Sequence, residues 1–258
     1  MLERLKLSGN SMINRMAELD TVSNNLANQS TSGFKRDKVF VNELQQQIQR
    51  LSAEPIRLGG QAAQSTAGVT QPAFDSIIDF TQGSLEGTGN PFDAAISGDG
   101  LFMVETPQGE AFTRDGRFTM NPDGVLSTLD GNAVLGEGGP IEIDLQQNSP
   151  TQLLINDKGE ILLNNSVIDT LRIVSAQNPQ NFEKIGANLF RLMPGVDEPG
   201  PAEDFAVKQG FLEESNVNAI EEMVAMIDIL HQYQIAEKSV KTEDSVLNRA
   251  VNDIGRVA

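Results

Sequence analysis

MLERLKLSGNSMINRMAELDTVSNNLAN, residues 1–28, is the stretch that sets the architecture of this chain. It contains no proline and a single glycine, and its apolar and small residues return at alternating steps of three and four. This spacing is typical of a helix that presents one stripe to a partner helix, as in a coiled coil. The stripe consists of Leu2, Leu5, Gly9, Met12, Met16, Leu19, Ser23 and Leu26.

The first helix is expected to end within the segment from Asn28 to Gly33. Asparagine is a poor residue inside a helix but a good one at caps and turns, and the segment around 24–28 holds Asn24, Asn25 and Asn28. Together with Gly33 they predict a turn that leaves Phe34 as an apolar residue beside it. A polar helical stretch carrying Val39, Val41, Leu44, Ile48 and Leu51 is expected to follow. We take residues 1–51 as the N-terminal assembly region.

The C-terminal region, residues 211–258, has a similar pattern. Ser215 and Asn216 are expected to end the last strand, and Val217 then leads to Asn218, which with Glu221 forms a capping-box pattern at a helix start. The three–four rhythm continues through Met226, Ile229, Tyr233, Ala236, Val240, Glu243, Leu247, Ala250, Ile254 and Val257. The apolar face is widened by Ile220, Met223, Val224, Ile227 and Leu230. The sequence thus predicts a second long amphipathic helix.

The middle of the chain, residues 71–210, has the pattern of a β domain. Short runs rich in β-branched and aromatic residues alternate with turn sequences such as Asn121-Pro122-Asp123-Gly124. This alternation predicts an antiparallel, sandwich- or barrel-like all-β domain. The expected strands are 101–105, 110–114, 117–120, 125–128, 141–145, 152–155, 160–163, 170–176 and 188–192. Residues 52–70 are small and polar, which indicates an extended linker to this domain.

The predicted fold is therefore a mainly β central domain flanked by two terminal helices that form a coiled-coil bundle. Even if the two ends pair with each other, part of an amphipathic stripe stays uncovered and needs a partner. The methionines at 12, 16, 223 and 226 fall on these helices, where a flexible side chain suits contact with non-identical neighbours as well as ordinary core filling. This arrangement is typical of a polymer subunit.

Composition argues against several classes of function. The formal net charge is −17, so nucleic-acid and membrane-surface binding are not expected. No Trp and one Tyr leave little material for a cofactor pocket, and the absence of Cys excludes disulfides and thiolate metal sites. The N-terminus lacks the pattern of a cleaved signal peptide, and no run is long and apolar enough to insert in a membrane.

No catalytic, cofactor or metal site is predicted. The aspartates at 99, 115, 123, 130 and 157 do not form a D-x-[DN]-x-[DN]-G calcium loop and fit tight turns instead. The single histidine, His231, has neither the cysteines of a zinc site nor a serine-protease signature around it. A cell-wall hydrolase with paired carboxylates is the alternative from another class, although no segment singles out a pair.

Four segments carry a resemblance to a known family. VSNNLANQSTSGFKR (22–36) and SNVNAIEEMVAMI (215–227) resemble the terminal signatures of the flagellar rod and hook proteins. GNPFDAAISGDGLFMVETPQG (89–109) and FTRDGRFTMNPDGVLSTLDGNAVLGEGGPI (112–141) resemble the β domain of the rod subunits. Four motifs in the family's order cover both ends and much of the middle.

The resemblance implies a structural subunit of the bacterial flagellar basal-body rod rather than an enzyme. It implies export by the flagellar type III apparatus, assembly in the cell envelope (the periplasm of a Gram-negative cell), and partners that are copies of the chain and other rod subunits. The Gly-Glu-Gly-Gly-Pro-Ile run at 136–141 looks more like the proximal rod subunit, with the distal subunit as the alternative. The expected assembly residues are Leu5, Met12, Met16, Leu19, Asn24, Asn25, Leu26, Asn28, Gly33, Phe34, Asn216, Val217, Asn218, Met223, Met226, Ile227, Ile229, Tyr233, Val240 and Leu247.

Overall fold

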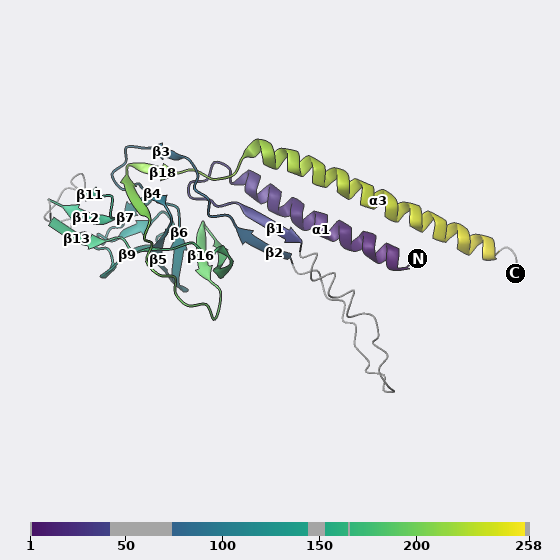
Figure 1. Ribbon diagram of the computed structural model, residues 1–258, viewed down its shortest axis with the longest axis horizontal. Helices are drawn as coiled ribbons and strands as arrows, with labels where there is room; N and C mark the ends of the chain where they lie inside the picture. Colours follow the sequence, from purple (N-terminus) through teal and green to yellow (C-terminus); the bar gives the residue numbers. More distant parts are fainter. Residues whose placement is uncertain (1, 42–73, 144–152, 165, 256–258) are drawn as a thin grey trace, which may run out of the picture. The chain divides into compact units, whose positions relative to one another are not determined.

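The chain folds into two compact units, seen in the computed structural model of Figure 1, which describes residues 2–41, 74–143, 153–164 and 166–255. The helical unit comprises Met1–Asn24, Lys38–Ile77 and Ile220–Ala258. The β unit comprises Asn25–Asp37 and Ile78–Ala219. The chain therefore enters the β unit twice, first through a short N-terminal segment and later through the long central one.

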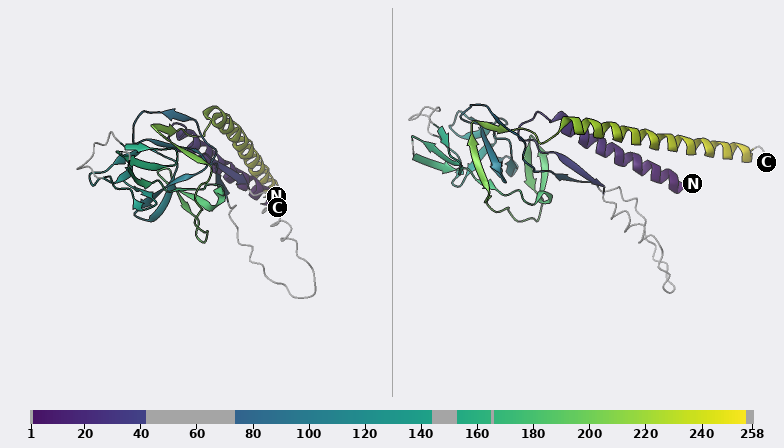
Figure 2. Two further views of the ribbon diagram at one scale, coloured as in Figure 1. Left: turned by 60° about the vertical axis from the view of Figure 1, so that its left-hand side comes forward. Right: turned by 45° about the horizontal axis from the view of Figure 1, so that its top comes forward.

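The helical unit contains most of the two long helices. Helix α1 spans Leu2–Ala27 and helix α3 spans Ala219–Gly255; they are the purple and the green-to-yellow ribbons of Figures 1 and 2. Strands β1 (Asp37–Val41) and β2 (Phe74–Ile78) form a two-stranded sheet. Proline is absent from both helices, and Glu221 and Glu222 in the first turn of α3 complement the positive end of its dipole.

The β unit is built around a nine-stranded sheet in which all paired strands are antiparallel. Along the main path its order is β15-β16-β6-β5-β9-β8-β7, with β10 on β9 and β14 on β5. These strands are β5 (Leu101–Thr106), β6 (Gly109–Thr113), β7 (Phe118–Met120), β8 (Leu126–Thr128), β9 (Ala133–Gly136), β10 (Gly139–Pro140), β14 (Ile173–Val174), β15 (Phe182–Gly186) and β16 (Leu189–Leu192).

Three smaller sheets complete this unit. A three-stranded sheet has the order β11-β12-β13, and two strand pairs are β17-β4 and β18-β3. The bounds are β3 (Leu85–Gly87), β4 (Ala94–Gly98), β11 (Leu153–Ile155), β12 (Glu160–Leu163), β13 (Ser166–Thr170), β17 (Phe205–Gln209) and β18 (Phe211–Glu213). A 3-10 turn, η2, covers Pro179–Asn181.

The core of the β unit lies on both faces of strand β5. Phe102 and Val104 belong to one apolar cluster, and Leu101 and Met103 belong to a second. Because successive strand residues point to opposite faces, this division shows that β5 is covered on both sides. The Phe102 and Phe118 rings meet edge to face with their centroids 5.1 Å apart. The β unit thus has two apolar layers, one on each side of β5.

The structure confirms a mostly antiparallel β protein with two helices. It also places most of the expected central strands, with shifts of one or two residues at their ends. Two expectations were wrong. Val39 and Val41 lie in strand β1 rather than in a helix, because 37–41 pairs with β2, and the described part of 141–145 holds only a bridge from Glu142 to Val125. The remainder of the expected second helix and the 52–70 linker lie outside the described residues.

Candidate functional site: the junction of the terminal segments

Residues 25–37, here called the strap, join the β unit although they are distant in sequence from the rest of it. The strap contains the end of α1 and the turn that follows. It meets two other segments, 79–84 and 213–216, and each segment contacts the other two through hydrogen bonds. We call this three-segment contact the junction. It brings the N-terminal and C-terminal signature sequences together.

The centre of the junction is a buried ion cluster around Glu213. The Lys35 ammonium lies 2.5 Å from Glu213 Oε1, and the Arg114 Nε lies 2.5 Å from Oε2. The backbone N–H of Gly83 also donates to Oε1 (2.8 Å), and Lys35 Nζ donates to the Thr81 carbonyl (2.8 Å). The side chains of Lys35 and Glu213 are 0% exposed and that of Arg114 is 3% exposed. A carboxylate buried to this degree requires such partners.

The remaining donors of Arg114 are used by the backbone of the neighbouring strands. Its Nη2 donates to the carbonyls of Ile96 (2.9 Å) and Gly98 (2.7 Å), and its Nη1 donates to the Gly100 carbonyl. The guanidinium therefore connects β4 and the following turn to the carboxylate at the end of β18. With four of its five N–H donors engaged by the same subunit, Arg114 acts as a structural tie.

Asn25 and Asp37 close the strap on itself. The Asn25 amide donates to the Asp37 carbonyl (2.9 Å), and the Asp37 N–H donates to the Asn25 side-chain oxygen (3.0 Å). Asn25 is 1% exposed, so these two bonds satisfy a buried amide at the point where α1 ends. Asn25, in the last turn of α1, thus holds the start of β1 against the end of the helix.

Asn216 ties the C-terminal signature to both other segments. Its side-chain oxygen accepts from the Arg36 N–H (2.8 Å), and its amide donates to the carbonyls of Asp79 (2.8 Å) and Thr81 (3.0 Å). The backbone adds a parallel set, since the Asp79 N–H donates to the Arg36 carbonyl (2.8 Å). One asparagine two residues before Asn218 thus links the strap to the segment that begins the central domain.

A third group of contacts fixes the strap to strand β15 and the turn after it. The Lys184 ammonium lies 2.8 Å from the Asp37 carboxylate and 4.1 Å from the centroid of the Phe34 ring, and it donates to the Lys35 carbonyl. The Asn188 amide donates to the Ser32 carbonyl (3.1 Å). Phe34, expected as an apolar residue at the turn, is buried under this lysine.

Gly33 occupies a position that only glycine fills without strain. Its φ is +69°, a left-handed conformation, and its N–H donates to the Glu213 carbonyl (2.7 Å). A Cβ there would lie 2.4 Å from the backbone nitrogen of Asp115. Both the dihedral and the close approach exclude a side chain. The helix-ending glycine predicted from sequence is therefore also a packing surface for the loop after β6.

Burial shifts the proton affinity of the two lysines in this region. Loss of hydration lowers the pKa of Lys35 below its usual 10.5, and the attraction to Glu213 opposes this without cancelling it. Burial likewise lowers the pKa of Lys184, against the raising effect of Asp37. In the ion cluster the two cations, Lys35 and Arg114, share the single carboxylate of Glu213. Loss of this carboxylate would therefore leave both cations without their counter-charge.

The expected seam of α3 faces inward in its described part. Ile229 is 8% exposed, and Met226, Tyr233 and Val240 are half-buried. A second apolar set lies on the outer face of the same helix, where Ile227 is 53% exposed. This outer stripe consists of Ile220, Met223, Val224, Ile227 and Leu230, each of which is exposed. Helix α3 thus has one covered apolar face and one uncovered apolar face.

Helix α1 gives a similar result with fewer residues. Met12, Leu19 and Leu26 are half-buried, whereas Met16 is exposed, as is Ile13 beside the seam. The side chains of Leu5 and Leu247 lie outside the described residues, so their roles in assembly stay predictions. Asn28 accepts from the Thr31 hydroxyl through its side chain, while Asn24 and Asn218 are exposed and Val217 is half-buried beside the junction.

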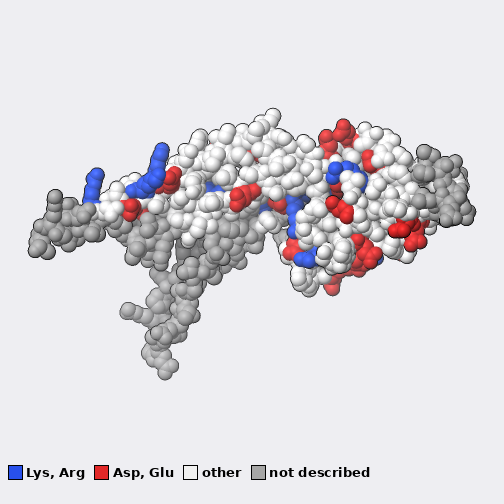
Figure 3. All heavy atoms as spheres, turned by 180° about the vertical axis from the view of Figure 1, so that it is seen from behind, with Lys and Arg blue, Asp and Glu red and all other residues white. Residues whose placement is uncertain are grey.

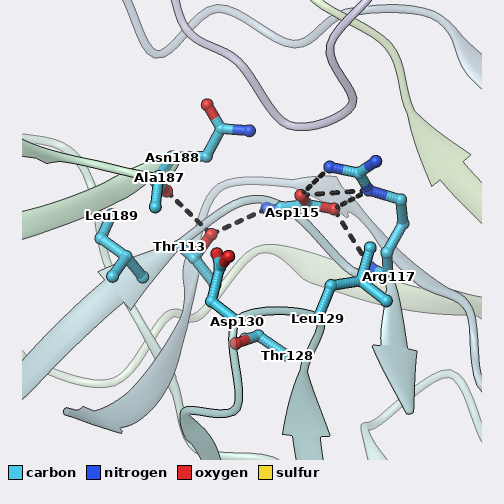
Figure 4. A pocket seen from close by; sticks show the side chains of 9 residues that line it. All are labelled: Thr113, Asp115, Arg117, Thr128, Leu129, Asp130, Ala187, Asn188 and Leu189. Atoms are coloured by element: carbon cyan, nitrogen blue, oxygen red, sulfur yellow. Dashed lines mark hydrogen bonds and ion pairs between the residues drawn. The ribbon is translucent and has the colours of Figure 1, made fainter.

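A pocket of about 200 Å³ lies beside the strap, lined by residues that include Asp115, Arg117, Asp130 and Asn188 (Figure 4). The Arg117 guanidinium is already paired with Asp115 at 2.6 Å, and this bond raises the pKa of Arg117. Ligand pockets are usually larger and mainly apolar. The arginine here is engaged by its own neighbour, so we assign the pocket no chemistry.

In the view of Figure 3, Asp and Glu side chains gather over the β unit, with Lys and Arg among them. Among the side chains that the structure describes, no three potential metal ligands lie close enough to hold an ion. Within the described ranges neither helix is long and apolar enough to span a bilayer.

Three parts of this chain match family models of known proteins. Residues 5–35 match the family model "Flagella basal body rod protein", and residues 95–163 match "Flagellar hook protein FlgE/F/G D1 domain". Residues 208–253 match "Flagellar basal body rod FlgEFG protein C-terminal". The flagellar basal-body rod protein FlgG of Bacillus subtilis is 33% identical over 98% of this chain and 99% of its own length. This chain belongs to the flagellar basal-body rod protein family.

Other members of this rod family show a comparable similarity. The rod protein FlgF of Caulobacter vibrioides is 34% identical over 93% of each chain, and FlgG of Borreliella burgdorferi is 31% identical over 98% of each chain. The relatives are named as structural rod proteins and not as enzymes, in agreement with the prediction from sequence. The resemblance drawn from the four motifs is confirmed.

The three matched regions of the rod family meet at the buried ion cluster. Lys35 lies in the N-terminal match, Arg114 in the central one and Glu213 in the C-terminal one. Sequence reasoning missed all three, together with Lys184. Lys35 and Arg114 stand inside the motif segments 22–36 and 112–141, but no spacing rule joins residues 178 positions apart, such as Lys35 and Glu213.

Proposed function

We propose that this chain, a structural subunit of the flagellar rod, polymerises through its two terminal helices. The observation that carries the proposal is the outer stripe of α3, because Ile220, Val224 and Ile227 leave apolar surface exposed on a long helix. Such a stripe on a soluble protein marks a contact surface. The inner seam of the helix is already partly covered, so the outer stripe is the part available to a neighbour.

The helical ends are proposed to pair as a coiled-coil bundle and to stack against those of adjacent copies and other rod subunits. Contacts that do not close into a ring build a helical tube. The β unit, whose core covers both faces of its main sheet in a sandwich-like manner, then serves as a rigid body beside the tube. No cofactor, metal or nucleic acid is part of this proposal.

We place the subunit in the proximal rod, with the distal rod as the other outcome of the test. The support is the resemblance of the run at 136–141 to the proximal rod subunit. Within this run, Gly136 packs against the Asp169 carboxylate, where a Cβ would lie 2.4 Å from Oδ2. Overall similarity does not separate the two positions, since differently named rod proteins are 33% and 34% identical to the chain. Export by the flagellar type III apparatus and a periplasmic position in Gram-negative cells belong to the same proposal.

The experiment is an in-frame deletion of the coding sequence, followed by electron microscopy of extracted basal bodies and a motility assay. Loss of rod and hook is expected, with rescue by the full-length gene but not by one lacking residues 1–30. Immunogold labelling of rescued basal bodies then locates the subunit along the rod. Normal flagella and swimming in the deletion strain would contradict the proposed function, and a peptidoglycan-release assay would then test a wall hydrolase.

A further inference from the structure

We propose that the strap, residues 25–37, is a lock whose docking into the β unit and the ordering of segment 213–216 occur as one cooperative step. The inference concerns the single subunit and goes beyond the proposed assembly. It rests on the way three segments distant in sequence share partners in the junction. The last residues of α1 and the first residue of α3 both belong to the β unit, so this step fixes the inner ends of both helices together.

The first support is that each segment of the junction has hydrogen-bond partners in both of the other segments. Glu213 takes hydrogen bonds from Lys35 in the strap and from Gly83, and its carbonyl accepts from Gly33. Asn216 takes one from Arg36 in the strap and gives others to residues 79–81. Withdrawal of the strap therefore removes partners from 213–216 at both ends and opens Glu213 to water.

The second support is the burial of charge. Lys35 leaves water completely when the strap docks, and its compensation comes from Glu213 and the Thr81 carbonyl at once. A partly docked strap would carry a dehydrated ammonium without its full set of acceptors, a costly arrangement. Intermediate positions are thus disfavoured, and the strap is either bound through the whole set of contacts or released.

The third support is that the strap belongs to a different compact unit from the residues on either side of it. The preceding residues Met1–Asn24 and the following residues from Lys38 cluster with the helical unit, while the strap clusters with the β unit. The Asn25–Asp37 pair closes the strap at its two ends, Asn188 bonds to its middle at Ser32, and Lys184 bonds to its last residues, Lys35 and Asp37. The strap is therefore a defined element with its own boundary contacts.

The test is hydrogen–deuterium exchange with mass spectrometry on the dilute full-length protein and its Asn25→Ala variant. Asn25 exchanges two hydrogen bonds with Asp37 at the edge of the junction. If docking is cooperative, protection of Gly33, Gly83 and Glu214 N–H groups falls together by about tenfold, while strand β5 keeps its protection. Ser30→Ala, an exposed position within the strap, is the matched control and should leave exchange unchanged.

The milder variant Asn188→Ala, which loses the bond to the Ser32 carbonyl, keeps the test decisive if Asn25→Ala fails to fold. It should produce the same joint loss of protection, smaller in size. Three results would overturn the lock: faster exchange confined to residues 25–37, equal loss across β5 and the junction, or unprotected Gly33 and Arg36 amides in the unaltered protein. None of these depends on whether rods form.

Discussion

The junction and the outer stripe of α3 differ in how far residues of the same subunit cover them. At the junction, Lys35, Arg114 and Glu213 are almost fully buried and every one of them has partners from the same subunit. On the outer stripe, Met223 is 46% and Ile227 is 53% exposed among the residues that the structure describes. One region is complete in the monomer, and the other is not.

This difference separates residues that hold the subunit together from residues that join subunits. Changes at the junction should lower the free energy of unfolding of the isolated chain. Changes on the outer stripe should leave that free energy nearly constant and act on assembly. Because the free energy of unfolding and assembly are measured separately, each variant below can support or contradict this distinction.

The largest effect on stability is expected from Glu213→Gln. The substitution leaves the Lys35 and Arg114 cations buried without a counter-charge, and breaking a buried ion pair costs about 3–5 kcal/mol. Urea unfolding followed by circular dichroism measures the change. Glu86→Gln, at an exposed carboxylate on β3, is the control and should shift stability by less than about 0.5 kcal/mol. Equal stability of the two variants would mean that the cluster does not hold the junction.

A smaller loss is expected from Gly33→Ala. The left-handed φ of +69° and the approach to the Asp115 nitrogen predict a destabilisation of at least about 2 kcal/mol. Gly9→Ala should instead stabilise the protein. Gly9 lies inside α1 with open space around it, and alanine favours the helix by about 0.5–1 kcal/mol. Thermal melts of both variants test this pair. A neutral Gly33→Ala would contradict the described turn.

Ile227→Asp should change assembly and not folding. An exposed helix position tolerates the carboxylate within about 0.5 kcal/mol, whereas a charge placed in a packed interface finds no partner. We expect a monomer of normal stability that fails to complement the deletion strain in a swimming assay. Gln232→Asp adds the same charge at an exposed position away from the stripe and should restore swimming. Loss of motility in both variants would contradict a specific role of the outer stripe in assembly.

The smallest effect is expected from His231→Ala. His231 is exposed on α3, four residues after Ile227, and alanine keeps that surface free of charge. Stability and swimming should both match those of the unaltered protein. A clear loss of swimming with normal stability would assign His231 a specific contact with a neighbouring subunit.

The sequence was sufficient for the elements whose patterns are long. The repeated steps of three and four identified α1 to its end near Asn28 and the start of α3 beside Asn218. Turn sequences located β5, β6, β7, β8 and β12 closely. Short strands without a turn signal on both sides, such as β3 and β18, were missed because two or three residues carry too little periodicity.

The candidate site was only half accessible to the same reasoning. Asn25, Gly33 and Asn216 were singled out for their local roles at caps and turns, and these roles place them in the junction. The charged residues around them, Lys184, Arg114 and Glu213, depend on tertiary contacts between residues far apart in sequence, such as the 178 positions between Lys35 and Glu213. The sequence also did not show which apolar face of α3 would be covered, since Met226 on the seam is half-buried and Met223 on the outer stripe is exposed.

The most direct test of assembly through the helices uses the absence of cysteine from this chain. Ile227→Cys and Asp123→Cys each introduce a single thiol, the second at an exposed turn of the β unit. Maleimide labelling is measured on the monomer and on isolated rods. We predict that the Ile227→Cys thiol reacts in the monomer and is protected in rods, while the Asp123→Cys thiol reacts in both. Equal labelling of Ile227→Cys in monomers and rods would contradict assembly through this face.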